Sequence, residues 1–201
     1  DFPLMLELAL KASDWHGFET RKAASSSRGM LRGHGFACHI DSTSGIAPTE
    51  SVDVVVDTQG RCEFRSGTQE MGQGLHSTYL GIAVGALGLP VDVIEVIQGD
   101  TARVRSGVGS YGSRSLYIGG AAIAMAAEAL IDEARRLGAQ LLEVTESDGE
   151  VAYTNGIVST ADGRRQLTLG EIAAAQDDGT IRVEAEAEAP FCFPNGCYVC
   201  E

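Results

Sequence analysis

The longest regular pattern in this chain is helical, and it lies in the middle of the sequence. Apolar residues recur three, four or seven positions apart between about Ser113 and Leu142. The members of this stripe are Leu116, Ile123, Ala127, Leu130, Ala134 and Leu137. Such spacing predicts one long helix with a single buried face. Any fold of the chain must therefore pack its other elements along a long helix.

Strand patterns lie on both sides of this helix. Val52–Val56 and Arg61–Arg65 flank a polar turn that ends at Gly60, which predicts a hairpin. A second hairpin is expected from Glu150 to Thr160, because its centre is an Asn-Gly pair. Ile181–Ala189 alternates strictly between apolar and polar residues, which indicates a strand with one solvated face.

Shorter helices complete the pattern. Leu75 to Leu87 predicts a helix that ends at Gly88, with a buried strand after it from Val91 to Ile97. Further expected elements are a helix behind Pro3, a second helix through Phe18–Ala24 capped by Asp14, a strand within Gly29–Ile40, a loop from Asp41 to Glu50 and a short helix with a capping box at Thr168–Glu171.

The order of these elements favours an α+β fold over a doubly wound sheet, because hairpins and separate helices outnumber strand–helix–strand units. We find no internal repeat and no low-complexity linker, so residues 1–201 are predicted to be a single fragment of one domain. The sequence starts at Asp1 without an initiating Met and ends in apolar residues such as Tyr198 and Val199. We therefore expect an internal piece of a longer protein.

The charge of the chain restricts its partners. Its 28 acidic and 15 basic residues give a formal net charge of -13, which argues against nucleic acid as a partner. The longest apolar run, Ile118–Ala127, is short of the roughly 20 residues that a transmembrane segment needs. Without a signal peptide, the cytoplasm is the expected location, and the five cysteines are expected to be reduced thiols.

The first candidate binding site is the glycine-rich segment Gly67–Gly74. Gly72 and Gly74 allow a ligand to approach the backbone, and Gln73 between them offers an amide that can donate and accept. The helix expected from Leu75 would direct free N–H groups and its positive end toward the same place. An ordinary glycine-rich turn that enters a helix is the alternative.

The second candidate is Gly107–Ser115, which also precedes a helix. Residues Gly107–Gly112 match the GxGxxG pattern of dinucleotide-binding domains, but no strand leads directly into these glycines. What remains is an expected anion nest formed by Gly112, Ser113, Arg114 and Ser115 at the helix N-terminus. Alternatively, Ser113 is simply a helix N-cap.

A third candidate rests on the spacing of Cys192, Cys197 and Cys200, which occurs in plant-type iron–sulfur proteins. A cluster would need Cys38 or Cys62 as a fourth ligand. Buried cysteines often act as small apolar side chains instead, which is the interpretation we favour. No metal-ligating residues are predicted in this chain.

Taken together, three segments resemble the molybdenum-binding subunit of the xanthine oxidase family, especially the bacterial branch with aerobic carbon monoxide dehydrogenase large subunits. They are Gly67–His76, Gln98–Thr101 and Gly109–Ser115. Phe193–Glu201 is similar to a later strand of the same subunit.

The resemblance implies a cofactor, namely molybdenum held by molybdopterin cytosine dinucleotide. By this resemblance Gln73 faces the molybdenum, Gly112–Ser115 anchor the pterin and its pyrophosphate, and Gln98, Gly99 and Asp100 lie near the dinucleotide.

The resemblance also implies an activity and partners. Members insert a water-derived oxygen into a C–H bond of a small-molecule substrate, as aldehyde oxidases do, or oxidise carbon monoxide. Their electrons pass to iron–sulfur and flavin (FAD) subunits.

The family's catalytic glutamate and substrate loop lie outside this stretch. We therefore expect no catalytic residue in the fragment, and no activity without the remainder of the large subunit. Two alternatives are a non-catalytic assembly module, in which the glycine motifs are only caps and turns, and an NAD-binding dehydrogenase domain based on the GxGxxG match.

Overall fold

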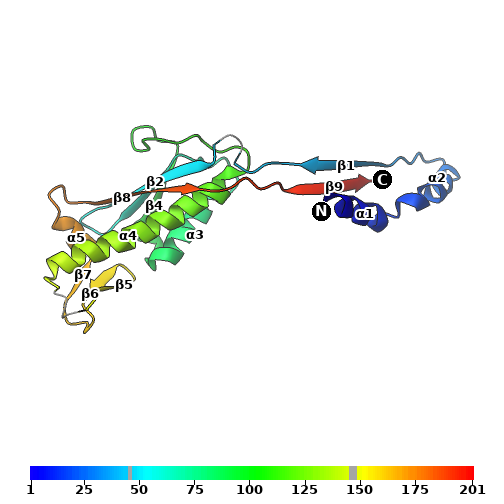
Figure 1. Ribbon diagram of the computed structural model, residues 1–201. Helices are drawn as coiled ribbons and strands as arrows, with labels where there is room; N and C mark the ends of the chain where they lie inside the picture. The colour runs from blue at the N-terminus through cyan, green and yellow to red at the C-terminus, as the bar shows by residue number, and fades with distance from the viewer. Residues whose placement is uncertain (45–46, 145–148) are drawn as a thin grey trace. The chain divides into compact units, whose positions relative to one another are not determined.

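The computed structural model describes residues 1–44, 47–144 and 149–201, which form two compact units (Figure 1). The first unit comprises Asp1–Thr43 and Cys192–Glu201, and the second comprises Ser44–Phe191. Both ends of the chain thus belong to one unit, and the second unit is formed by the continuous stretch between them.

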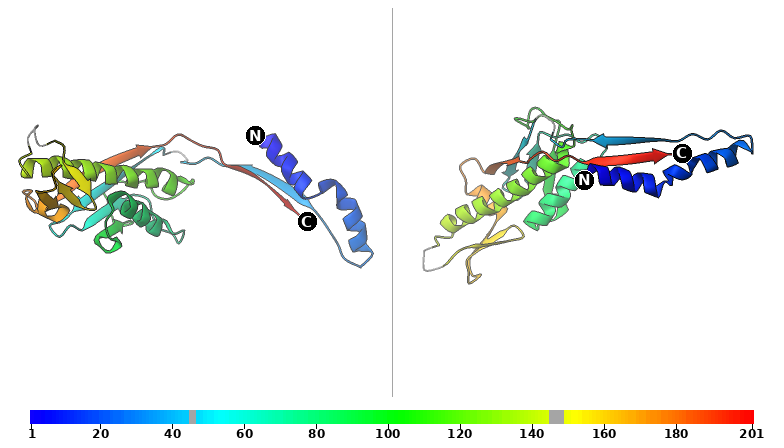
Figure 2. Two further views of the ribbon diagram at one scale, coloured as in Figure 1. Left: turned by 90° about the horizontal axis from the view of Figure 1, so that it is seen from below. Right: turned by 45° about the vertical axis from the view of Figure 1, so that its right-hand side comes forward.

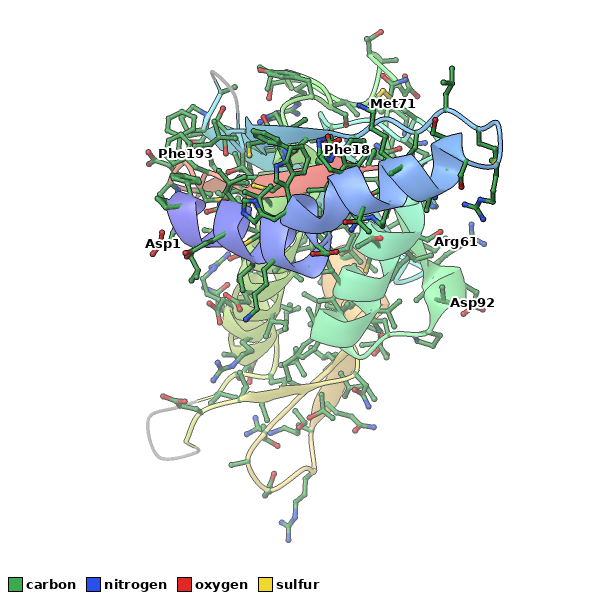
Figure 3. All side chains as sticks on the ribbon, turned by 90° about the vertical axis from the view of Figure 1, so that its right-hand side faces the viewer. Asp1, Phe18, Arg61, Met71, Asp92 and Phe193 are labelled. Atoms are coloured by element: carbon green, nitrogen blue, oxygen red, sulfur yellow. The ribbon has the colours of Figure 1, made fainter. Side chains whose placement is uncertain are left out.

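The first unit contains two helices and a two-stranded ribbon. Helix α1 (Phe2–Ala12) begins at Asp1, whose carboxylate accepts from the N–H of Leu4, and α2 spans Phe18–Ser26. Strand β1 (Gly35–Ile40) pairs antiparallel with β9 (Asn195–Cys200). Phe18, labelled in Figure 3, belongs to a stack of rings with Trp15 and His34.

The predicted cap of the second helix is wrong. Asp14 precedes a short 3-10 turn, Trp15–Gly17, and its side chain caps nothing. Its carboxylate lies 2.6 Å from the Arg21 guanidinium instead, and α2 starts after Gly17. The Asp14 side chain therefore forms an ion pair and does not cap the helix.

The second unit is built on a four-stranded mixed sheet in the order β4-β3-β2-β8. Strands β2 (Thr49–Val56) and β3 (Cys62–Ser66) form the predicted hairpin, and β8 (Ile181–Glu188) pairs antiparallel with β2. Strand β4 (Ile94–Ile97) runs parallel to β3, after a 3-10 turn that replaces the first part of the expected strand.

Two helices form the core with this sheet (Figures 1 and 2). Helix α3 (Leu75–Leu87) connects the parallel strands β3 and β4, and ends at Gly88 as predicted. Helix α4 (Gly120–Leu141) follows a π-helical turn at Ser115–Gly119 and packs against β2, β8 and α3. Its fully buried residues include Ile123, Ala127, Leu130 and Ala134 of the predicted stripe.

A smaller sheet and a short helix complete the second unit. Strands β5 (Ala152–Thr154) and β6 (Ile157–Ser159) turn on Asn155-Gly156, both with positive φ, and β7 spans Gln166–Thr168. Helix α5 (Leu169–Ala174) begins with the predicted capping box of Thr168 and Glu171.

The α+β prediction with one long helix is confirmed. Only the helical segment Ser115–Leu141 is long and apolar enough to cross a membrane, among the residues that the structure describes. Core helices of globular proteins have the same length and composition, and this one buries a complete face against the sheet. Its apolar residues are therefore explained by the core of the second unit.

Candidate functional site

The two glycine-rich segments of the sequence cross each other in the second unit. The N–H of Gln69 donates to Ser110 Oγ, and that hydroxyl donates to the Gln69 carbonyl oxygen, each over 2.8 Å. Beside this pair Gly67 packs against Gly107 so closely that a Cβ on Gly67 would lie 2.2 Å from the Gly107 Cα. We call this contact of Gly67, Gln69, Gly107 and Ser110 the loop crossing. Only two facing glycines permit such an approach of the backbones.

A buried chain of hydroxyl groups joins the first glycine-rich segment and α3 to the start of the π-helical turn. Ser66 Oγ and Thr68 Oγ1 are 2.8 Å apart, and Thr68 Oγ1 is 2.8 Å from the Tyr79 hydroxyl. Tyr79 in α3 donates in turn to the carbonyl oxygen of Ser115 at the start of the π-helical turn. Burial raises the pKa of Tyr79, which keeps its proton available for this bond. These hydrogen bonds therefore fix the start of the π-helical turn relative to α3.

The N-terminus of α3 already holds an anion that the chain itself provides. The Glu70 carboxylate accepts from the N–H groups of Gly72 (2.6 Å), Gly74 (3.1 Å) and His76 (2.9 Å). The prediction that this helix directs free N–H groups at a ligand is therefore wrong, because Glu70 occupies them. The sequence contained the signal, a glutamate five residues before Leu75.

Gln73 is held inside its own loop. Its side-chain oxygen accepts from the N–H of Met71, and its Nε2 donates to the Gln69 carbonyl oxygen over 3.0 Å. Gln73 is exposed. Its neighbour Met71, labelled in Figure 3, is exposed over 66% of its surface. The structure thus presents Gln73 at the surface of a loop that Gln69 and Ser110 fix.

We expect the stability contributed by Glu70 to disappear in acid. The backbone donors, His76 first, hold the pKa of Glu70 below its ordinary value of 4.5. A lowered folded-state pKa means that the contribution is complete above the unfolded-state value and is lost as the pH falls through the folded-state value. When the pH is lowered from above 4.5 to below the folded-state pKa of Glu70, the urea midpoint should therefore fall less in Glu70→Gln than in the natural sequence.

Glu128→Gln is the control for this measurement. Glu128 is exposed on α4 and makes no hydrogen bond or ion pair with the residues that the structure describes. Its pH profile should match that of the natural sequence. Two results would contradict the stabilising role of Glu70: a reduced pH dependence of the urea midpoint in Glu128→Gln as well, or an unreduced pH dependence in Glu70→Gln.

Arg114 lies in the core. None of its side chain is exposed, and its guanidinium is 2.5 Å from the Glu50 carboxylate. It also donates to the carbonyl oxygens of Thr49 (2.6 Å), Gly109 (2.8 Å) and Ala47 (3.3 Å). The prediction that this side chain supports an anion nest is wrong, because its charge is neutralised by Glu50. Arg114 instead holds the second glycine-rich segment against the start of β2.

The backbone beside Arg114 retains the properties of an anion nest. Gly112 and Ser113 have φ values of 53° and 55°, so two successive residues are left-handed before the chain turns helical at Arg114. Their N–H groups donate to no other residue in the described part of the chain. The Ser113 side chain accepts no capping hydrogen bond from a residue that the structure describes, and the cap position of the π-helical turn is Arg114, so the alternative of Ser113 as N-cap is wrong. Successive N–H groups in such conformations form concave anion sites.

The third predicted segment lines a groove beside the loop crossing. Gly99 and Asp100 line it together with Gln69 and Gly107, around a volume of about 280 Å³. Gln98 donates from Nε2 to the Thr68 carbonyl oxygen over 3.0 Å, whereas its buried Oε1 has no partner in the described residues. The structure thereby brings the three predicted segments together within one unit.

Several residues of this arrangement make contacts that the sequence did not predict. They are Gly67, Gln69, Glu70, Gly107 and Ser110 at the loops, and Glu50 beneath them. All except Glu50 lie inside or next to the glycine motifs, where their positions were the only available signal. Within the described residues, no group of three or more His, Cys, Asp or Glu side chains forms a metal site. The cysteines of the iron–sulfur spacing form no such group in the described residues: Cys197 faces Cys38, and Cys192 lies by Thr43.

The chain matches the family described as "Molybdopterin cofactor-binding domain" over residues 8–201. This chain belongs to that family. The molybdopterin-binding family of the xanthine oxidase type is thus confirmed, whereas the NAD-binding alternative gains no support. The loop from Gln98 onward separates β4 from the GxGxxG match, contrary to a dinucleotide-binding strand–turn–helix.

Curated relatives of this domain are molybdenum-dependent oxidoreductases. The chain is 30% identical to the carbon monoxide dehydrogenase large chain of Hydrogenophaga pseudoflava, covering 100% of this chain and 27% of the relative. It is 31% identical to subunit gamma of the 6-hydroxypseudooxynicotine dehydrogenase complex of Paenarthrobacter nicotinovorans, covering 88% and 22%. The domain therefore spans about a quarter of the length of these relatives.

Comparison with solved structures agrees with the family membership. A carbon monoxide dehydrogenase from Oligotropha carboxidovorans superimposes with a TM-score of 0.66 at 26% identity, covering 100% of this chain and 28% of that one. Quinoline 2-oxidoreductase from Pseudomonas putida 86 gives the same TM-score at 22% identity, covering 98% and 28%, which shows the shared fold alone.

Proposed function

We propose that the domain supplies part of the binding site for molybdopterin cytosine dinucleotide in a molybdenum hydroxylase or a carbon monoxide dehydrogenase-like enzyme. The loop crossing carries this proposal, because the Gln69–Ser110 bonds bring both glycine-rich segments and the Gln98–Asp100 segment to one place. Family membership supplies the identity of the cofactor, and the crossing supplies the reason why these segments act together.

The residues present fit such a cofactor. The unpaired N–H groups of Gly112 and Ser113 suit a phosphate, and Ser115 follows on the same turn. The groove along Gly99 and Asp100 is the proposed place of the nucleotide end. When bound, the dithiolene of this cofactor would supply the metal ligands.

Within this proposal each segment has a different task. Gly72, Gln73 and Gly74 present a rigid amide surface toward the pterin end, because Glu70 and Gln69 fix that loop. Arg114 positions the nest through Glu50 without binding the phosphate itself. When bound, the cofactor supplies the redox chemistry that inserts oxygen into a C–H bond or oxidises carbon monoxide.

The whole protein is proposed to be a large subunit in the cytoplasm. Its partners would be the remainder of that subunit, iron–sulfur and flavin subunits, and a small-molecule substrate. The relatives' names support a multi-subunit complex, since they are a "large chain" and a "complex subunit gamma". We expect the 201-residue chain alone to lack activity, and turnover of an aldehyde, a purine or carbon monoxide by it would refute this.

Ser110→Ala in the whole protein tests the proposal. The change removes both hydrogen bonds of the loop crossing, each worth about 0.5–1.5 kcal/mol, so cofactor retention should fall roughly tenfold. The measurement is molybdenum and cytidine monophosphate per polypeptide after acid release. Ser77→Ala, an exposed position on α3, should keep the full content. Full cofactor content in Ser110→Ala would remove the loop crossing from the binding site.

A further inference from the structure

Two cysteines far apart in the sequence face each other across the ribbon of the first unit. Cys38 in β1 and Cys197 in β9 are directly opposed in the antiparallel register. Their Sγ atoms are 3.1 Å apart. Directly opposed residues of antiparallel strands have Cα separations of about 4.5–5.5 Å, within the range that a disulfide spans.

Both thiols can be reached from solvent. Cys38 is exposed and Cys197 is partly exposed. Cys62 differs from both, because it is fully buried and its burial raises its pKa to about 12. Cys200 is exposed on the same strand as Cys197 but faces Gly35, so no thiol lies opposite it. The ribbon therefore holds one opposed thiol pair, Cys38 and Cys197, and one exposed thiol without an opposed thiol, Cys200, which serves as a control.

We propose that Cys38 and Cys197 are a reversible dithiol–disulfide site that a hydroperoxide oxidises. The more exposed Cys38 thiolate attacks one peroxide oxygen, which breaks the O–O bond and gives a sulfenic acid and hydroxide. The hydroxide takes up the proton that the Cys38 thiol released and becomes water. The Cys197 thiolate then attacks the Cys38 sulfur and expels hydroxide, which takes a proton and leaves as water. Two thiols thus lose two electrons and two protons, and one hydrogen peroxide becomes two waters. A small thiol reductant reverses the step by exchange.

The order of attack follows from the surroundings of the two sulfurs. The hydrogen bond with Cys38 raises the pKa of Cys197, as does its partial desolvation. Cys38 is also the more exposed of the two sulfurs, so the hydroperoxide reaches it first, and Cys197 resolves the sulfenic acid afterwards. The sulfur that must move is already in contact with its target.

The bond would have a structural effect because the ribbon is weakly held. Every side chain of β1 is exposed, and two-stranded ribbons are marginally stable by themselves. The link would join positions on either side of the second unit in the sequence, and so enclose Ser44–Phe191 in a covalent loop. Oxidation should therefore slow the opening of β1 and β9.

The test uses the reduced 201-residue chain, treated with hydrogen peroxide, then blocked with a thiol reagent and weighed intact. The natural sequence should lose two of its five thiols together and recover both with dithiothreitol. Cys200→Ser should lose the same two. Cys38→Ser and Cys197→Ser should form no internal disulfide, and the peptide link between the two strands should be absent after digestion.

Amide hydrogen exchange gives a second readout that does not depend on the Cys38 and Cys197 variants. Exchange in Gly35–Ile40 and Asn195–Cys200 should slow on oxidation of the natural sequence and of Cys200→Ser. A disulfide that still forms in Cys197→Ser would assign the chemistry to another cysteine and overturn the proposal. So would single-cysteine oxidation of the natural sequence with unchanged exchange in the ribbon.

Discussion

Replacing Arg114 by alanine is expected to lower the free energy of unfolding by about 3–5 kcal/mol, the cost of breaking a buried ion pair from one side. The guanidinium has no exposed surface and donates to Glu50 and to three backbone carbonyl groups. Alanine would leave the 1% exposed Glu50 side chain without its counter-charge and the carbonyls without donors. Burial already raises the pKa of Glu50, so the carboxyl group should take up a proton in the variant.

Urea unfolding of Arg114→Ala and Glu50→Gln measures both sides of the pair. Arg136→Ala is the control, since its ion pair with Glu133 is exposed on α4 and should contribute under about 1 kcal/mol. The double variant Glu50→Gln/Arg114→Met should recover part of the loss, because no unpaired charge remains in the core. Equal losses for Arg114→Ala and Arg136→Ala would contradict the buried-pair interpretation.

Most of the fold was accessible from local patterns. Periodicity located α3 and α4, Asn155-Gly156 located a turn with positive φ at both positions, and Thr168 with Glu171 located a capping box. Each of these signals is contained within a few neighbouring residues, so no tertiary contact is needed to interpret it.

The errors at the candidate site have the opposite origin. Arg114 beside Ser113 resembles an anion site in the sequence, and only Glu50, 64 positions earlier, shows that its charge is already satisfied. In the same way, Asp14 forms an ion pair with Arg21 and does not cap the helix as predicted. Polar side chains have several acceptable partners, and the choice among them depends on which distant segments meet. The backbone nest at Gly112 and Ser113 was easier to predict because it depends on local conformation alone.

Gly67→Ala is expected to have the second large effect, at the loop crossing itself. An added Cβ would lie 2.2 Å from the Gly107 Cα, 2.6 Å from the Ser106 carbonyl oxygen and 2.8 Å from Glu50 Oε1. Two of these neighbours are backbone atoms, and the Gln69–Ser110 bonds prevent the loops from separating freely. Overpacking of this kind costs about 1–3 kcal/mol. The whole protein should also lose cofactor, because the segments on both sides of the contact must shift.

Gly81→Ala separates this effect from a general effect of removing glycine. Gly81 is exposed within α3 and has open space where a Cβ would lie, so alanine there should raise the stability by about 0.5–1 kcal/mol. Molybdenum content of the whole protein, measured beside urea midpoints, distinguishes two causes. If Gly67→Ala is destabilised yet keeps its molybdenum, the crossing serves the fold alone. If molybdenum falls in Gly67→Ala and not in a variant of equal stability loss elsewhere, the closeness of the two loops is itself what retains the cofactor.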